Sequence, residues 1–271
     1  MNFCTPKEIL ELTIKNSEAK ARNSPKKQIL LGFMGGLYIA IAGFGFVLCK
    51  AIFKGELEAL GNIIGAVLFP AGLMMVVISG GELFTGNALM AAYGFENKSA
   101  WKEILLNWLY VYLGNFLGSV FVAILALASG KFFSANFFLG DIALSIAINK
   151  VEYSFVSAFS LGILCNILVA GAVWMATAAK DISGKIFACF FPIMLFVFSG
   201  FEHSVANMYY LFSAFLISKT PFFSGSVDPY LLSLKNIFLK NLIPVSLGNV
   251  VGGAVIIAGL YSITYKKKSC D

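Results

Sequence analysis

Long apolar runs alternate with short polar and charged segments along this chain of 271 residues. The apolar runs cover residues 29–49, 60–92, 104–128, 154–179, 186–217 and 237–264. Each run is long enough for a membrane-spanning helix, which needs about 20 predominantly apolar residues. The pattern therefore predicts an all-α membrane protein with six transmembrane helices.

The second and fifth runs differ from the others because a polar patch containing glycine interrupts each of them. The first patch, SGGELFTGN, spans 79–87, and the second, SGFEHS, spans 199–204. Each of these runs predicts two half-helices joined by a non-helical loop. Backbone of that kind is tolerated at membrane depth only where protein buries it or water reaches it.

An internal repeat relates the two halves of the chain. The pattern SGxE occurs at 79–82 and 199–202, LGN at 113–115 and 247–249, and LG at 31–32 and 161–162. Because each half contributes three spans, an odd number, the halves must run in opposite directions through the membrane. Inverted repeats with broken helices at corresponding positions place a permeation site at the repeat interface, near the bilayer midplane.

Composition supports a membrane protein and indicates its orientation. Hydrophobic residues make up 59% of the chain and charged residues 13%, well below the roughly 25% charged residues of soluble domains. If both termini are cytoplasmic, thirteen of the twenty Lys and Arg residues fall in cytoplasmic flanks, as the positive-inside rule requires. The prediction is a multi-pass protein of the cell's inner or plasma membrane. It has a cytoplasmic N-terminal segment at 1–28 with a surface helix near 6–23, a six-helix channel domain at 29–265 and a cytoplasmic tail at 266–271.

The remaining composition excludes several kinds of site. The five cysteines are scattered without paired spacing, so neither a disulfide framework nor a metal site is predicted, and no cofactor is expected. The basic net charge of +6 is explained by cytoplasmic flanks, so we expect a lipid bilayer rather than nucleic acid as the partner.

His203 is the single histidine of the chain, and it lies inside the second patch. Ionisable groups at membrane depth are costly and mark functional sites. We therefore interpret His203 as a residue that donates a hydrogen bond, attracts an anion or transfers a proton. The alternative is a structural histidine held inside the bundle.

Other polar residues near the patches are candidates for the same site. Thr85, in the equivalent break, either orients the histidine, hydrogen-bonds a permeant species or satisfies a backbone carbonyl. A carboxylate lining an anion path would repel the anion, so Glu82 and Glu202 are predicted to fix their loops by accepting backbone N–H bonds. Asn166 lies in an apolar run and needs a partner, either Lys150, the histidine or a backbone group.

The residues around these candidates have ordinary explanations from the sequence alone. Lys150 precedes the fourth run and has the position of a flank lysine. Asn115 and Asn249 each follow a glycine and are predicted to be helix-packing positions with small neighbours. Large apolar side chains flank the breaks, where they form either hydrophobic constrictions or ordinary core: Phe69, Leu73, Leu83 and Phe196.

Taken together, these motifs resemble the formate/nitrite transporter family over residues 5 to 264. GFEHSVANM at 200–208 is similar to the family's fifth-helix signature, and LFTGN at 83–87 looks like its second-helix loop. Further motifs resemble those of its third, fourth and sixth helices, at 107–115, 161–166, 172–175 and 241–249.

The resemblance implies an aquaporin-like protomer assembled as a homopentamer, with one path in each protomer. Thr85, Lys150 and His203 would be the family's central threonine, vestibule lysine and central histidine, and Asn166 a polar partner near the last two. Residues matching the family's constrictions would be Leu73, Leu83 and Phe196 on the cytoplasmic side and Phe69 on the outer side.

The resemblance also implies a substrate class of small monovalent anions, including formate, nitrite and hydrosulfide. The chain has Gly-Glu at 81–82 where formate channels carry Ala-Asp, and Gly-Asn at 86–87 where they carry Ser-Thr. These departures make it look closer to the hydrosulfide-channel branch. In the predicted mechanism, the lysine draws the anion into a vestibule and the histidine, backed by the threonine, supplies a proton or a hydrogen bond as the anion passes.

Two rival functions come from other classes. A membrane enzyme using His203 as a base would need a nucleophile or a metal nearby, and the sequence contains neither a second histidine nor a cysteine cluster. A neutral-solute channel of the aquaporin type would carry paired Asn-Pro-Ala loops, which the sequence lacks. We therefore predict a transporter or channel rather than an enzyme.

Overall fold

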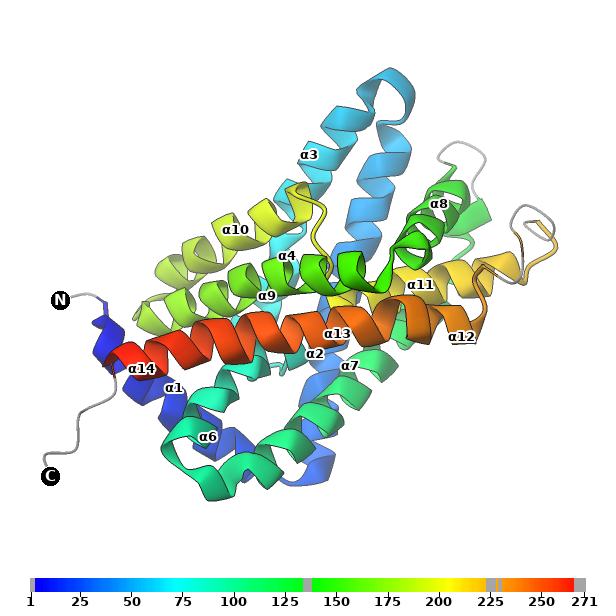
Figure 1. The fold of residues 1–271 in the computed structure, drawn as a ribbon. Coiled ribbons are helices and arrows are strands. Elements are labelled where there is room, and N and C mark those ends of the chain that lie inside the picture. The colour runs from blue at the N-terminus through cyan, green and yellow to red at the C-terminus, as the bar shows by residue number, and fades with distance from the viewer. Residues whose placement is uncertain (1–2, 134–137, 223–227, 229–230, 266–271) are drawn as a thin grey trace, which may run out of the picture.

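The protein is described by a computed structural model covering residues 3–133, 138–222, 228 and 231–265, and it is built from helices in two similar halves (Figure 1). The first half comprises α1 (Pro6–Ala21), α2 (Pro25–Ile52), α3 (Glu58–Leu68), α4 (Pro70–Ser79), α5 (Phe84–Asn87), α6 (Ala91–Glu96) and α7 (Trp101–Ala128). The second comprises α8 (Leu139–Glu152), α9 (Phe155–Ala178), α10 (Ile182–Phe198), α11 (Ser204–Ser218), α12 (Leu234–Asn236), α13 (Ile243–Val250) and α14 (Leu260–Tyr265). Two π-helical segments, Ile237–Leu242 and Val251–Gly259, join the last three helices.

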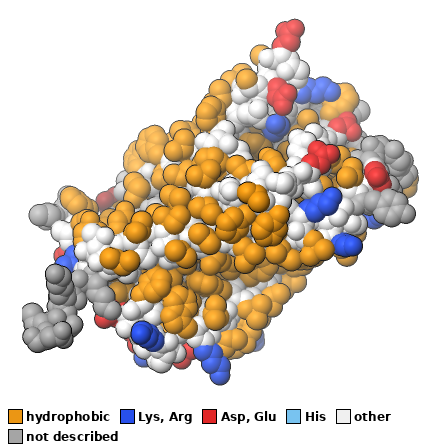
Figure 2. Space-filling view, in the orientation of Figure 1, with side chains coloured by type: hydrophobic (Ala, Val, Ile, Leu, Met, Phe, Trp, Pro, Cys, Tyr) orange, Lys and Arg blue, Asp and Glu red, His pale blue; other side chains and the backbone are white. Residues whose placement is uncertain are grey.

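Six spans cross the bundle, as the apolar runs predict. Within the described residues, five helical stretches are each long and apolar enough to cross a membrane: Pro25–Ile52, Gly55–Ser79, Lys98–Ala128, Phe155–Ala178 and Leu234–Tyr265. The fifth span in chain order is split into two shorter apolar helices, α10 and α11. Hydrophobic side chains cover most of the face in Figure 2, and charged side chains lie toward its edges, as a lipid-facing surface requires.

Close approach of backbones holds the spans together. A Cβ atom at Gly36 of α2 would overlap the carbonyl oxygen of Asn115 on α7, and one at Gly248 of α13 would overlap the carbonyl oxygen of Phe159 on α9. Small residues at such crossings let membrane helices pack tightly. The α2–α7 pair and the α9–α13 pair are thus built in the same way, as expected for a repeat.

Both predicted helix breaks are present, and both begin with a glycine. Gly80 ends α4 with φ of 86°, and Gly200 follows α10 with φ of 68°. Glycine adopts this left-handed conformation without steric cost, which lets the chain leave the helix sharply. Two residues after each glycine, a backbone N–H donates to a carbonyl of another span. Glu82 donates to the Leu31 carbonyl at 2.9 Å, and Glu202 donates to the Leu161 carbonyl at 3.3 Å.

The N-terminal surface helix is present as α1, and it has an unpredicted counterpart in α8. Each of these helices precedes a serine that caps the next span, Ser24 for α2 and Ser154 for α9. Helix α2 begins at Pro25, so the predicted boundary after residue 28 falls inside its first turn. The predicted tail at 266–271 lies outside the described residues.

Candidate functional site

Two cavities reach the helix breaks, and each contains one lysine close to a break. The Lys150 vestibule, about 210 Å³, has a lining that includes Phe46, Lys50, Phe69, Lys150, Tyr153, Phe196, Gly200, Glu202, His203, Ala206, Asn207 and Tyr210. The Lys20 vestibule, about 450 Å³, has a lining that includes Asn16, Lys20, Lys27, Leu73, Val76, Gly80, Glu82, Leu83, Gly86, Asn87, Ala176 and Lys185.

Residues at equivalent repeat positions line the two vestibules. Positions 80, 82, 83, 86 and 87 in one correspond to 200, 202, 203, 206 and 207 in the other, and position 20 corresponds to 150. Among the described residues, no side chain lines both cavities. The vestibules are therefore two inverted versions of one site, at opposite ends of the repeat interface.

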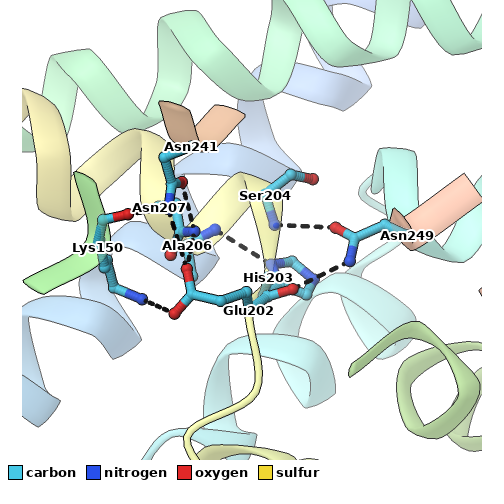
Figure 3. Close-up of polar contacts among 8 residues, drawn as sticks. All are labelled: Lys150, Glu202, His203, Ser204, Ala206, Asn207, Asn241 and Asn249. Carbon is cyan, nitrogen blue, oxygen red and sulfur yellow. Dashed lines mark hydrogen bonds and ion pairs between the residues drawn. The ribbon is translucent and has the colours of Figure 1, made fainter. Parts of the chain in front are cut away.

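A carboxylate held by two asparagine amides forms the floor of each vestibule. Oε2 of Glu202 accepts hydrogen bonds from Nδ2 of Asn207 at 2.6 Å and of Asn241 at 3.2 Å (Figure 3). The same arrangement surrounds Glu82, whose Oε2 accepts from Asn87 at 2.7 Å and Asn107 at 3.3 Å. Both glutamates are 2% exposed. The donors to the carboxylates are thus side-chain amides, whereas the sequence analysis expected backbone N–H groups.

The two lysines bind to these clusters differently. Nζ of Lys150 lies 2.6 Å from Oε1 of Glu202 (Figure 3). Nζ of Lys20 donates instead to Oδ1 of Asn87, at 2.7 Å. Burial lowers the pKa of Lys20 from its ordinary value, an effect that the negative charge of Glu82 opposes. Each buried carboxylate therefore has a lysine within its cluster or next to it.

A third asparagine in each half fixes the break itself. Asn249 donates to the carbonyls of Gly162, at 2.8 Å, and Glu202, at 3.0 Å, and accepts from the N–H of Ser204 at 2.9 Å. Asn115 makes the matching three bonds, to Gly32, Glu82 and Phe84. The bonds to Glu82, Phe84, Glu202 and Ser204 satisfy backbone groups that the broken helices leave without partners, and the bonds to Gly32 and Gly162 tie each break to α2 or α9. Asn115 and Asn249 therefore do more than the helix packing predicted for them.

His203 and Thr85 are in direct contact. Nε2 of His203 lies 2.9 Å from Oγ1 of Thr85, and both residues are buried. Nδ1 of His203 accepts the N–H of Ala206 at 3.1 Å and so caps helix α11 (Figure 3). Because Nδ1 is an acceptor here, the proton of the neutral ring must lie on Nε2, which donates to the threonine oxygen. The threonine hydroxyl proton is then available to another acceptor.

Asn166 completes this region through backbone groups. Its Nδ2 donates to the carbonyl of Thr85 at 3.1 Å and to that of Asn249 at 2.6 Å. The sequence allows Lys150, His203 or a backbone group as the partner of Asn166, and in the structure its amide binds backbone carbonyls. Asn166 therefore ties the first break to the sixth span.

Large apolar side chains lie between the polar clusters, and one of them is placed differently from the prediction. Leu73 and Leu83 line the Lys20 vestibule, whereas Phe69 lines the Lys150 vestibule. Phe196 was expected with the two leucines, but it also lines the Lys150 vestibule, with its ring 5.7 Å from that of Phe69 and 5.7 Å from that of His203. Helix α10 is inverted relative to α4, so its last turn reaches the break from the Lys150 side.

Lys20 is the site residue that the sequence analysis overlooked. Its helix precedes the first span and was interpreted only as a surface segment. The repeat could have identified it. Gly32 and Gly162 are equivalent and lie 130 residues apart, and Lys20 and Lys150 lie the same distance apart in the sequence.

The sequence model of the family described as "Formate/nitrite transporter" matches residues 7–263. The chain is 38% identical over 260 residues to the formate channel FocA of Haemophilus influenzae, covering 93% of this chain and 92% of that relative. It is 37% identical over 286 residues to a probable formate transporter of Methanothermobacter thermautotrophicus, covering 98% and 99% of the two chains.

Solved structures agree with these sequence matches. A structure described as a pentameric formate channel with formate bound superposes with a TM-score of 0.76 at 35% identity, covering 90% of this chain and 98% of that one. A structure described as an FNT family ion channel superposes with a TM-score of 0.81 at 27% identity, covering 95% and 98%.

Proposed function

The chain belongs to the formate/nitrite transporter family, and from this premise we propose that it carries formate across the cytoplasmic membrane as a homopentamer, with one path through each protomer. It is a membrane transporter or channel, not an enzyme, because its relatives are channels and transporters. The formate and pentamer assignments rest on the names of those relatives.

One observation carries the proposed path: repeat-equivalent residues line two separate vestibules, and His203, which lines one of them, contacts Thr85, whose neighbours Leu83 and Gly86 line the other. In an inverted repeat, equivalent cavities are the two mouths of one route. Lys20 raises the local concentration of anions at its mouth, because charges in narrow clefts focus the field, and Lys150, paired with Glu202, lies at the floor of the other mouth. The buried side chains of Phe69, Leu73 and Leu83 then exclude hydrated ions between them.

We propose that formate passes this apolar zone as the neutral acid. A bare carboxylate is much more costly to bury than its protonated form. His203 keeps its proton on Nε2 and donates a hydrogen bond to Oγ1 of Thr85. The hydroxyl of Thr85 in turn donates a hydrogen bond to an oxygen of the passing formic acid. A second proton on Nδ1 would face the N–H of Ala206 and break the cap of α11. The histidine therefore lends a hydrogen bond, and the proton that neutralises formate is a hydronium proton from the solvent, which enters the vestibule with the anion and crosses with it.

Formate uptake into proteoliposomes tests this role. Thr85→Val removes the hydroxyl while keeping the shape of the side chain, and we expect uptake to fall about fivefold or more, since one hydrogen bond contributes about 1 kcal/mol. Thr85→Ser, the matched control, keeps the hydroxyl and should retain most of the uptake. His203→Ala and Lys150→Ala should both slow uptake. Native uptake and native pH dependence in Thr85→Val, His203→Ala and Lys150→Ala would refute the proposed path.

Hydrosulfide is the second candidate substrate, and one observation favours it. The positions that depart from formate channels include Glu82 and Asn87, which form the floor of the Lys20 vestibule. A competition series on one liposome preparation, with formate, nitrite, chloride and hydrosulfide as competitors of labelled formate, ranks them. Formate binding more tightly than hydrosulfide would support the first assignment, and the reverse order would support the second.

A further inference from the structure

Lys150 supplies little net charge to its vestibule, because a carboxylate compensates it closely. Its Nζ lies 2.6 Å from Oε1 of Glu202, which is 2% exposed. At that distance and burial the pair acts as a neutral unit toward an ion several ångströms away. Another cation is therefore needed if the vestibule is to attract anions strongly.

Lys50 lies on the lining of the same cavity and is compensated far less. Its short contact, 2.8 Å, is to the neutral Oδ1 of Asn62. The nearest carboxylate oxygen, on Glu58, is 3.4 Å away, on a side chain that is 63% exposed to solvent. The Lys50 side chain itself is 18% exposed, so solvent screens this pair mainly from the glutamate side, and such a pair contributes less than one with both partners buried. Lys50 also lies in the last turn of α2, where the helix carbonyls favour a positive charge.

We propose that Lys50 is the anion-recruiting residue of the Lys150 vestibule, supplying the net positive charge that the Lys150–Glu202 pair lacks. The inference rests on the proposed function, since it assumes that small anions enter here. In this division of roles, Lys50 draws the anion from solution. Lys150, held by Glu202 and by the carbonyl bond from Asn241 at 2.9 Å, shapes the floor near His203.

The chain contains a matched control four residues further on. Lys54 carries the same charge near the same end of α2, but it is absent from the cavity lining. Its Nζ lies 3.2 Å from the centre of the Phe138 ring. Replacing either lysine by glutamine therefore changes the net charge equally, and only Lys50→Gln changes the charge of the vestibule.

Initial formate uptake against formate concentration, applied from the Lys150 side at low ionic strength, measures the effect. We expect Lys50→Gln to raise the half-saturating concentration about threefold or more without changing the maximal rate, since it removes electrostatic attraction alone. Lys50→Arg should behave as native, and Lys54→Gln should also be unchanged. The effect should shrink when salt shortens the Debye length from about 30 Å at 0.01 M to about 10 Å at 0.1 M.

A charge-restoration experiment separates this role from folding. Lys50→Cys in assembled liposomes is labelled either with an aminoethyl methanethiosulfonate, which restores a cation, or with a neutral methyl reagent. The proposal is supported if the cationic label, and not the neutral one, returns the half-saturating formate concentration to its native value. Equal values for Lys50→Gln and Lys54→Gln, or equal effects of the two labels, would overturn it while leaving the proposed function intact. Absence of formate uptake by the native protein would instead contradict the proposed function.

Discussion

At the scale of single residues, the two halves differ most clearly at the N-cap position of the half-helix after each break, where only the second half has a side-chain cap. The position is leucine in the first half, Leu83, and histidine in the second, His203. Most other polar contacts at the breaks occur twice, through glutamate, asparagine and lysine. The histidine therefore makes an otherwise symmetric route polar at one point, which is where a hydrogen bond to a passing acid is needed.

The pH dependence at the Lys20 mouth follows from the direction of one pKa shift. Burial lowers the pKa of Lys20, so its charge is lost at a pH where an ordinary lysine, with a pKa of about 10.4, remains protonated. We expect half-saturating formate on this side to rise as pH increases through that lowered value. Glu82, Lys27 and Lys185 line the same cavity.

Lys20→Arg provides the comparison, because arginine stays protonated throughout this range. The ratio of native to Lys20→Arg half-saturation at each pH removes the titration of the substrate itself. A ratio that increases toward alkaline pH agrees with the shift. A constant ratio would mean that Lys20 does not act on the entering anion.

Several site residues were within reach of the sequence, and others were not. The break motifs and their offset place Thr85 and His203 at equivalent breaks, and the family resemblance brings Lys150 to the site. The roles of Asn115 and Asn249 were missed because their partners are backbone carbonyls and N–H groups, which leave no pattern in the sequence. Phe196 was misplaced because its side depends on the inverted direction of α10.

At the scale of the elements, the breaks are stable because each is fixed by one asparagine from a neighbouring span. Glycines in the left-handed conformation end the half-helices, and Asn115 and Asn249 then bind the exposed backbone groups. The apolar runs predicted six spans, with breaks in the second and the fifth. They did not predict α8, whose residues mix polar and apolar types and resemble an ordinary connection.

Asn249→Leu tests this account of the break. The substitution leaves the carbonyl of Glu202 and the N–H of Ser204 without partners, whereas the carbonyl of Gly162 lies inside α9 and loses only an additional bond. We expect it to destabilise the protein by roughly 1–3 kcal/mol for each orphaned group. Thermal unfolding in detergent, followed by loss of the monodisperse chromatographic peak, measures the change.

Ser246→Ala on the same helix is the matched control. It removes one hydroxyl, which lies 3.1 Å from that of Tyr112, and should cost no more than about 1 kcal/mol. If the two variants unfold at the same temperature, Asn249 does not hold the break.

At the scale of the whole molecule, the two mouths and the central contact of the proposed path all come from one chain. In the proposed pentamer each protomer would therefore carry its own path. Many large apolar side chains remain exposed, among them Leu57, Ile63, Val156 and Ile263, and lipid or neighbouring protomers would cover them. The sequence indicates this surface, while the number of subunits comes only from the relatives.

Light scattering of the purified protein, with the detergent contribution subtracted, tests the assembly. We expect a protein mass five times the 29.3 kDa of one chain. A single-chain mass that persists under mild extraction and still supports formate uptake after reconstitution would contradict the pentamer while leaving the path within each protomer in place.

The central claim is that formate crosses the apolar zone as the neutral acid while His203 keeps its single proton. Liposomes loaded with a pH-sensitive dye, given a formate gradient under a clamped membrane potential, measure the protons that accompany each formate. Protein-free liposomes and Thr85→Val liposomes set the background from leakage of formic acid through lipid. The account predicts one proton for each formate above that background, at a rate insensitive to the potential. Formate flux that follows the potential and moves no protons would contradict it.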